Sequence, residues 1–83
     1  MIVSGVTIVT KENCKWCVLA KKLLKKNKIV FKELNIPQSL SREEFFDLTD
    51  KYKTKRTVPK IFIGKELIGG YEDLDEYLKK IHS

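Results

Sequence analysis

The sequence contains little cysteine and histidine, and it has no long apolar run. Its 83 residues include two cysteines and one histidine. No apolar stretch approaches the roughly 20 residues of a membrane-spanning helix. The apolar residues 1–10 lack a basic leader and continue directly into Lys11 and Glu12, so we interpret them as a strand and not as a signal peptide. We therefore expect a cytoplasmic protein with no membrane partner. Because cytosolic reductants keep thiols reduced, a cysteine pair in such a protein is more typical of catalysis or metal binding than of a structural disulfide.

Negative charge is scarce relative to positive charge. The chain has 17 Lys and Arg against 11 Asp and Glu, a formal net charge of +6. The excess lies mainly in lysine-rich runs at residues 21–28 and 51–56, and such runs usually form solvated faces. They also suit an anionic small substrate or an acidic protein. A basic nucleic-acid-binding protein is a rival interpretation, but we expect no nucleic-acid partner because no aromatic RNA-binding signature or helix-turn-helix accompanies the lysines.

The length and the hydrophobic periodicity predict one α/β domain over residues 1–83. A strand at residues 6–9, a helix at 18–28 and a strand at 29–35 form a unit whose right-handed crossover makes the two strands parallel. Ser41 and Glu44 form a capping box that opens a second helix. A hairpin follows at 61–63 and 66–68, and Tyr71 starts a last helix. The positions expected to face the sheet are Val18, Leu19, Ala20, Leu23 and Leu24 in the first helix and Phe45, Leu48, Thr49 and Tyr52 in the second.

The segment with the residues most suited to catalysis is Cys14-Lys15-Trp16-Cys17. A C-x-x-C pair that follows a strand and opens a helix is typical of a redox motif. We expect Cys14 in the first turn of the helix, where the helix start stabilises a thiolate, so Cys14 is the candidate nucleophile, with a pKa depressed from about 8.5. Cys17, one turn along on the inward side, can attack a mixed disulfide formed on Cys14, and the pair can cycle between dithiol and disulfide. The same spacing also occurs by accident or as half of a zinc site, although His82 is the only further Cys or His and a closed zinc site needs four ligands.

Three further features have both a structural and a ligand-binding interpretation. Pro59 suits the first residue of a strand, whereas a cis Val58–Pro59 bond would turn the Val58 backbone toward an extended, peptide-like ligand. The Gly69-Gly70 pair suits a tight bend, and it would also let a carboxylate approach bare backbone N–H groups before a helix. Trp16 either shields the neighbouring thiol or offers a flat wall to a substrate. The residues alone leave these alternatives open.

The cysteine pair, the segment Thr57-Val58-Pro59 and the segment Gly69-Gly70-Tyr71-Glu72-Asp73 occur in the order and at approximately the spacings of the glutaredoxin family. The chain resembles a small dithiol glutaredoxin over nearly all its length, from Val6 to Ile81. The resemblance implies a thioredoxin-like fold, in which a four-stranded mixed β-sheet is flanked by three helices and the Val58–Pro59 bond is cis. It also implies glutathione as co-substrate and no metal cofactor.

The resemblance also implies roles for individual residues. Cys14 would accept the glutathionyl group and Cys17 would be the resolving thiol. Val58 would pair through its backbone with the cysteinyl part of glutathione, Asp73 would lie near the γ-glutamyl ammonium, and Arg56 or Lys55 would meet the glycyl carboxylate. The implied glutathione-binding residues are Lys11, Trp16, Arg56, Thr57, Val58, Pro59, Gly70, Tyr71, Glu72 and Asp73.

One departure concerns the residues between the cysteines, where the family most often has Pro then Tyr and this chain has Lys15 and Trp16. Trp16 keeps an aromatic wall, and Lys15 adds positive charge near Cys14. The resemblance implies a monomeric enzyme that reduces protein–glutathione mixed disulfides and protein disulfides, with ribonucleotide reductase as one candidate partner. A rival is an iron–sulfur carrier in which two chains share a cluster through Cys14 and two glutathiones. Lys15 argues against it, because relatives that favour clusters have small residues between the cysteines.

Overall fold

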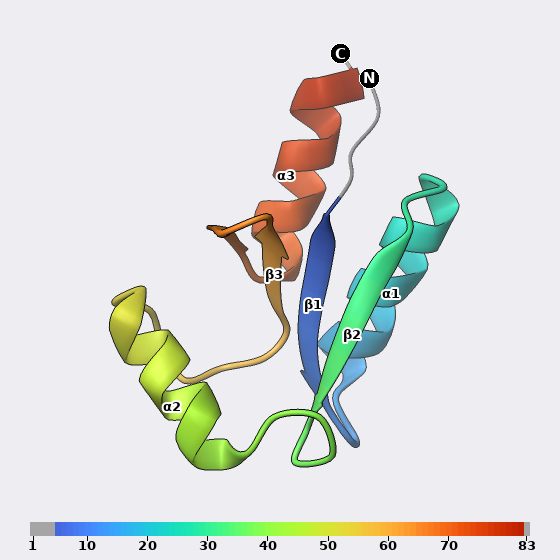
Figure 1. Cartoon of the computed structure of the whole chain (residues 1–83). Helices are drawn as coiled ribbons and strands as arrows, with labels where there is room; N and C mark the ends of the chain where they lie inside the picture. Colours follow the sequence, from blue (N-terminus) through green and yellow to red (C-terminus); the bar gives the residue numbers. More distant parts are fainter. Residues whose placement is uncertain (1–4, 83) are drawn as a thin grey trace.

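The computed structural model describes residues 5–82, apart from the side chain of His82 (Figure 1). The elements in chain order are β1 (Val6–Lys11), α1 (Lys15–Lys26), β2 (Phe31–Ile36), α2 (Arg42–Lys51), β3 (Lys60–Ile63), β4 (Glu66–Gly69) and α3 (Tyr71–His82). Every predicted helix and strand is present. The largest differences lie at the start of α1 and at the start of β2.

The four strands form one mixed sheet in the order β2-β1-β3-β4. β1 and β2 are parallel, with Val6 opposite Phe31, and α1 makes the crossover between them. β3 runs antiparallel to β1, with Ile61 opposite Ile8, and β4 completes the hairpin antiparallel to β3. This topology, with three helices, confirms the predicted thioredoxin-like fold.

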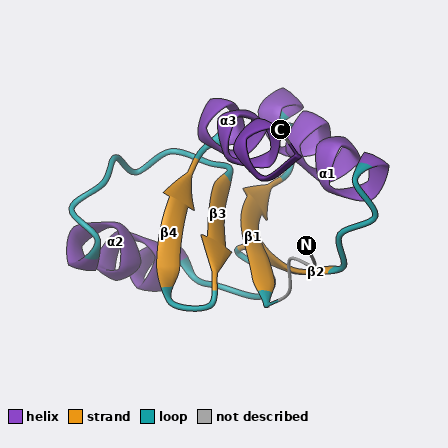
Figure 2. Cartoon of the chain, turned by 90° about the horizontal axis from the view of Figure 1, so that it is seen from above, coloured by secondary structure: helices purple, strands orange, loops and turns teal. Residues whose placement is uncertain are grey.

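Helices cover both faces of the sheet. In Figure 2, α1 and α3 lie together on one face and α2 lies on the other side. Because neighbouring side chains on a strand point to opposite faces, β1 contributes to two apolar cores. The core with α1 and α3 contains Val6, Ile8, Ala20, Leu24, Ile29, Ile61, Leu74 and Leu78. The core with α2 contains Val9, Phe45 and Phe62, with Leu48, Tyr52 and Val58 packed against them.

The first helix begins earlier than the sequence predicted. α1 starts at Lys15 and not at residue 18, so Cys14 is the N-cap and not a residue of the first turn. A side-chain acceptor at the N-cap satisfies one of the unpaired N–H groups of the first turn, and here the Cys14 sulfur accepts from Cys17 N–H at 3.2 Å. The helix ends at the predicted Asn27 cap.

The buried face of α1 also differs from the prediction at two residues. Cys17, Ala20 and Leu24 are buried and share one stripe at helical spacing. Val18 and Leu19 were predicted to face the sheet, but both lie off this stripe: Val18 is 47% exposed, and Leu19 is half-buried outside the two cores. β2 begins at Phe31 and not at residue 29, although Ile29 is still buried in the core.

The second helix has the predicted capping box. The Ser41 hydroxyl accepts from Glu44 N–H, and the Glu44 carboxylate accepts from Ser41 N–H, both at 3.0 Å. Phe45 and Thr49 are buried, as their spacing predicted.

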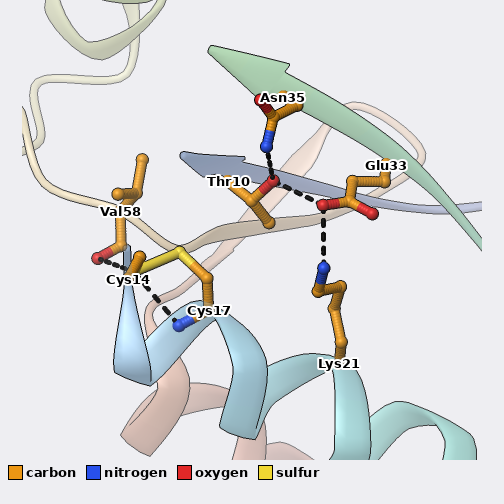
Figure 3. The surroundings of a disulfide bond; sticks show 7 residues. All are labelled: Thr10, Cys14, Cys17, Lys21, Glu33, Asn35 and Val58. Atoms are coloured by element: carbon orange, nitrogen blue, oxygen red, sulfur yellow. Dashed lines mark hydrogen bonds and ion pairs between the residues drawn. A yellow bond between two sulfur atoms is a disulfide. The ribbon is translucent and has the colours of Figure 1, made fainter. Parts of the chain in front are cut away.

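A polar cluster ties α1 to the two parallel strands (Figure 3). The Thr10 hydroxyl, which is buried, donates to Glu33 Oε2 at 2.6 Å, and Lys21 Nζ lies 3.0 Å from the same oxygen. Asn35 Nδ2 donates to Thr10 Oγ1 at 3.0 Å. The Thr10 hydroxyl is the main cause that holds the pKa of Glu33 below its ordinary value of 4.5; burial opposes it, and Lys21 adds to it.

Replacing Glu33 by Gln should lower the free energy of unfolding by about 1 kcal/mol at pH 7, because the charge assistance to both hydrogen bonds is lost while the side chain is partly exposed. The folded-state pKa of Glu33 is lowered, so its contribution is fully present above pH 4.5 and declines as the pH falls through the folded-state value. Urea denaturation of both proteins at pH 7 and pH 3 should therefore show the difference shrinking at pH 3. Glu66→Gln, an exposed strand position, is the control, and an equal effect there would contradict the assignment.

Candidate active site

The two cysteines are joined by a disulfide, with Cα atoms 5.2 Å apart (Figure 3). They differ in access. Cys17 is 2% exposed and belongs to the buried stripe of α1, whereas Cys14 is half-buried at the N-cap. An incoming sulfur can therefore reach Cys14 and not Cys17, which agrees with the predicted roles of nucleophile and resolving thiol.

The start of α1 favours negative charge on the Cys14 sulfur, which accepts the Cys17 N–H at the positive end of the helix. The Val58 carbonyl oxygen lies 3.9 Å from the sulfur and places the loop before β3 beside it. The Val58–Pro59 bond is cis, as the resemblance implied, and a second cis bond, Ile36–Pro37, was not predicted.

A cleft of about 510 Å³ adjoins the cysteine pair through Trp16 and Val58. It gathers most of the predicted glutathione-binding residues from three separate parts of the chain. Its lining comprises Trp16, Lys53, Thr54, Lys55, Thr57, Val58, Pro59, Lys60, Gly69, Gly70, Tyr71, Glu72 and Asp73. Two predicted residues, Lys11 and Arg56, are not among them. They line a separate hollow that meets the cleft at Thr57 and Val58.

Trp16 forms a wall of the cleft. Trp16 is 52% exposed, and the centroid of its ring lies 5.5 Å from that of the Tyr71 ring, with the two rings tilted by 44°. Between the two earlier interpretations, the exposure favours a surface for substrate over a simple shield of the thiol. The two aromatic rings come from α1 and α3, so the cleft is bordered by the N-terminal ends of both helices.

At the other end of the cleft, Asp73 folds back over the start of α3. The Gly70 N–H donates to Asp73 Oδ2 at 3.1 Å. Gly69 has a φ of +131°, and a Cβ there would clash with the Asp73 carboxylate. A glycine at this position is thus needed for both the backbone conformation and the approach of the carboxylate.

Lys60 is a cleft residue that was not among the predicted site residues. It is 5% exposed, and its Nζ donates to Thr57 Oγ1 at 3.0 Å. Burial lowers the pKa of Lys60, while the negative charge of Asp73 acts in the opposite direction. The sequence offers no signal for this position. Lysine is rarely buried, so a lysine that follows a proline at a strand start is expected to be exposed.

Within residues 5–82, no group of three or more His, Cys, Asp or Glu side chains could hold a metal ion. The side chain of His82, the remaining candidate in the zinc interpretation, lies outside the described residues. None of the described helices is long and apolar enough to cross a membrane.

Comparison with known proteins gives consistent matches. The family model Glutaredoxin matches residues 6–68. Glutaredoxin 3 of Escherichia coli K12 is 42% identical over 86% of this chain and 82% of its own. The crystal structure of glutaredoxin 1 from Francisella tularensis, complexed with cacodylate, is 36% identical over 93% of this chain and 94% of its own, with a TM-score of 0.78. A buckwheat glutaredoxin–glutathione complex is 25% identical over 92% of this chain and 69% of its own, with a TM-score of 0.81.

The geometry around Cys14 predicts a thiol pKa below the ordinary value of about 8.5, because the Cys17 N–H and the start of α1 stabilise the thiolate. The pH dependence of alkylation of the reduced protein gives the value directly, and a midpoint at or above about 8 would contradict the cap geometry. Lys15→Glu should raise the midpoint by less than about one unit, because Lys15 is exposed and solvent screens its charge. Lys22→Glu, also exposed on α1, is the control and should leave the midpoint nearly unchanged.

Proposed function

The chain belongs to the glutaredoxin family and is a thiol–disulfide oxidoreductase, and from this premise we propose that it reduces protein–glutathione mixed disulfides with glutathione as co-substrate. The observation that carries the proposal is the cleft beside the half-buried Cys14, which holds both signs of charge. Its lining includes three lysines and the carboxylates of Glu72 and Asp73. A ligand that carries an ammonium and carboxylates along an extended backbone suits such a cleft.

We propose that glutathione lies along the cleft with its γ-glutamyl end at the start of α3. The backbone N–H groups near Glu72 and Asp73 would hold the γ-glutamyl carboxylate, and the Asp73 side chain would pair with the ammonium. The cysteinyl part would pair with the Val58 backbone, which brings its sulfur to Cys14. The buckwheat protein, which shares the fold, is complexed with glutathione, and this supports glutathione as the ligand of the cleft.

The glycyl end would then point away from α3, past Val58. Arg56 and Lys11 line the hollow that meets the cleft at this residue, so they are the candidates for the glycyl carboxylate. Lys55 lies in the cleft itself. We therefore propose Arg56 and not Lys55 as the partner of the glycyl carboxylate; these are the two alternatives that the resemblance left open.

The proposed reaction is two successive thiol–disulfide exchanges. The Cys14 thiolate attacks the glutathionyl sulfur, the substrate S–S bond breaks, and the protein thiolate leaves. A second glutathione thiolate then attacks the glutathionyl sulfur on Cys14 and releases glutathione disulfide, so the two electrons come from glutathione. Alternatively, Cys17 attacks the Cys14 sulfur and releases glutathione, which leaves the Cys14–Cys17 disulfide.

We also propose that the protein acts as a monomer in the cytosol, where thiols are kept reduced. Protein disulfides would be reduced by both cysteines, and a ribonucleotide reductase is one candidate substrate. Measuring the reduction of an oxidised ribonucleotide reductase by the dithiol protein tests that step. A rate no higher than that with glutathione alone would contradict it.

Replacing Cys14 by Ser should abolish all activity, because the other cysteine is buried. Cys17→Ser should keep the reduction of glutathionylated substrates, since glutathione can resolve the intermediate, and should lose the reduction of protein disulfides. Both activities are measured in an assay coupled to glutathione reductase, with a glutathionylated peptide and with a protein disulfide. Turnover by Cys14→Ser, or the loss of both activities in Cys17→Ser, would contradict the assigned roles.

Replacing Asp73 by Asn should raise the Michaelis constant for glutathionylated substrates several-fold, because the ammonium loses its charged partner. Asn keeps an oxygen that can accept the Gly70 N–H, so the start of α3 should persist. The Cys14 pKa and the reduction of disulfides that lack glutathione should stay nearly unchanged. The control is Glu76→Gln, an exposed position of the same helix outside the cleft. An unaltered Michaelis constant together with a lower melting temperature would make Asp73 only a helix-end acid, worth about 0.3–1 kcal/mol.

A further inference from the structure

A second hollow, of about 350 Å³, meets the cleft at Thr57 and Val58. We call it the Arg42 hollow, after a lining residue that no sequence motif singled out. Its lining comprises Lys11, Ile36, Arg42, Phe45, Phe46, Arg56, Thr57 and Val58. The side chains come from the end of β1, the end of β2, the first half of α2 and the loop before β3.

The Arg42 hollow is lined by three cations and by no carboxylate. Arg56 is partly balanced, since its guanidinium lies 3.6 Å from Asp50 and 4.2 Å from the Phe46 ring centroid. The side chains of Lys11 and Arg42 have no hydrogen-bond or ion-pair partner among the residues that the structure describes. Three cations less the carboxylate of Asp50 leave two uncompensated positive charges at one hollow.

Glutathione accounts for only part of this charge. Its glycyl end carries one carboxylate, which neutralises one of the two positive charges. Arg42, in the first turn of α2, is then left without an anion. The positive charge of the hollow therefore fits a ligand that brings a second negative group beyond the glycyl position.

Half of the lining residues of the hollow are apolar. Phe45 is buried and Phe46 is 37% exposed, and Ile36 and Val58 complete the apolar lining. Such a surface suits the methylene groups of a long acidic side chain, whose carboxylate then meets the cations of the same lining. A compact inorganic anion would leave this apolar surface uncovered.

We infer that the Arg42 hollow binds acidic residues that follow the reactive cysteine in polypeptide disulfide substrates. The inference rests on the proposed function, because the orientation of glutathione sets the direction of the substrate chain. Glycine follows cysteine in glutathione, so the residue after a substrate cysteine takes the glycyl position beside Val58. An extended chain advances about 3.3 Å per residue, and the next one or two side chains then enter the hollow.

The test compares three symmetric peptide disulfides reduced by the dithiol protein, with glutathione and glutathione reductase recycling the enzyme. In the first, Cys-Gly-Glu-Glu places the acids after the cysteine; in the second, Cys-Gly-Gln-Gln removes the charge; in the third, Glu-Glu-Gly-Cys places the acids before it. We expect kcat/KM to be roughly three- to ten-fold higher for the first peptide than for the other two. This is the effect expected from two solvent-exposed ion pairs. High salt should reduce this preference.

Arg42→Glu should abolish the preference for Cys-Gly-Glu-Glu. An acid in the first turn suits the helix dipole, so α2 should remain folded, and Arg42→Gln serves as a second, neutral variant. The matched control is Lys51→Glu, which makes the same charge change at the other end of α2, outside the hollow, and should keep the preference. Reduction of a glutathionylated small thiol should be unchanged in all three variants.

The possible failures are distinguishable. Equal rates for acids before and after the cysteine, or a preference that survives in Arg42→Glu, would overturn the inference while leaving glutathione turnover intact. A wild-type protein that fails to turn over the glutathionylated small thiol would instead overturn the proposed function, and with it the orientation on which the inference rests. A higher kcat/KM for the symmetric disulfide of a small thiol that carries a phosphate than for the Cys-Gly-Glu-Glu disulfide would also overturn the polypeptide assignment.

Discussion

The hydrogen bond from Cys17 N–H to the Cys14 sulfur is the contact on which the rest of the site depends. It makes the reactive sulfur the N-cap of α1, so the position of the sulfur is fixed by whatever fixes the helix. Two interactions do so: the packing of Ala20 and Leu24 in the core, and the link from Lys21 to Glu33 on β2. Since Thr10 on β1 holds the same carboxylate, the polar cluster locates α1 relative to both parallel strands.

The substrate side of the site is built from segments that are distant in sequence. The loop before β3 brings Val58 to the Cys14 sulfur, and the β3–β4 hairpin returns the chain so that Gly70 and Asp73 lie at the far end of the same cleft. Two hydrogen bonds join residues of the cleft lining: Lys60 donates to the Thr57 hydroxyl, and the Gly70 N–H donates to the Asp73 carboxylate. The cleft therefore contains both signs of charge, while the Arg42 hollow beyond Val58 is positive.

Local signals in the sequence were enough to predict the element order, the parallel pair and the capping box, because each depends on residues close together in the chain. The start of α1 was misplaced because a cysteine sulfur is not one of the usual N-cap acceptors. Val18 was misjudged because the buried stripe begins with Cys17, which counts as apolar only once its burial is known. Lys60 and Arg42 could not have been found, since their roles depend on how strands and helices meet across the sheet.

The three helices differ in the charges at their N-terminal ends, and the difference explains where the reactive sulfur lies. The first turn of α2 contains Glu43 and Glu44 beside Arg42, and the first turn of α3 contains Glu72 and Asp73, so acids outnumber cations at the positive ends of these helices. α1 has no acid in its first turn and starts with Lys15, an arrangement that disfavours the helix by about 0.3–1 kcal/mol. A thiolate at the N-cap supplies the missing negative charge. The same feature that weakens the isolated helix therefore stabilises the ionised form of Cys14, and ionisation of the sulfur in turn stabilises the helix.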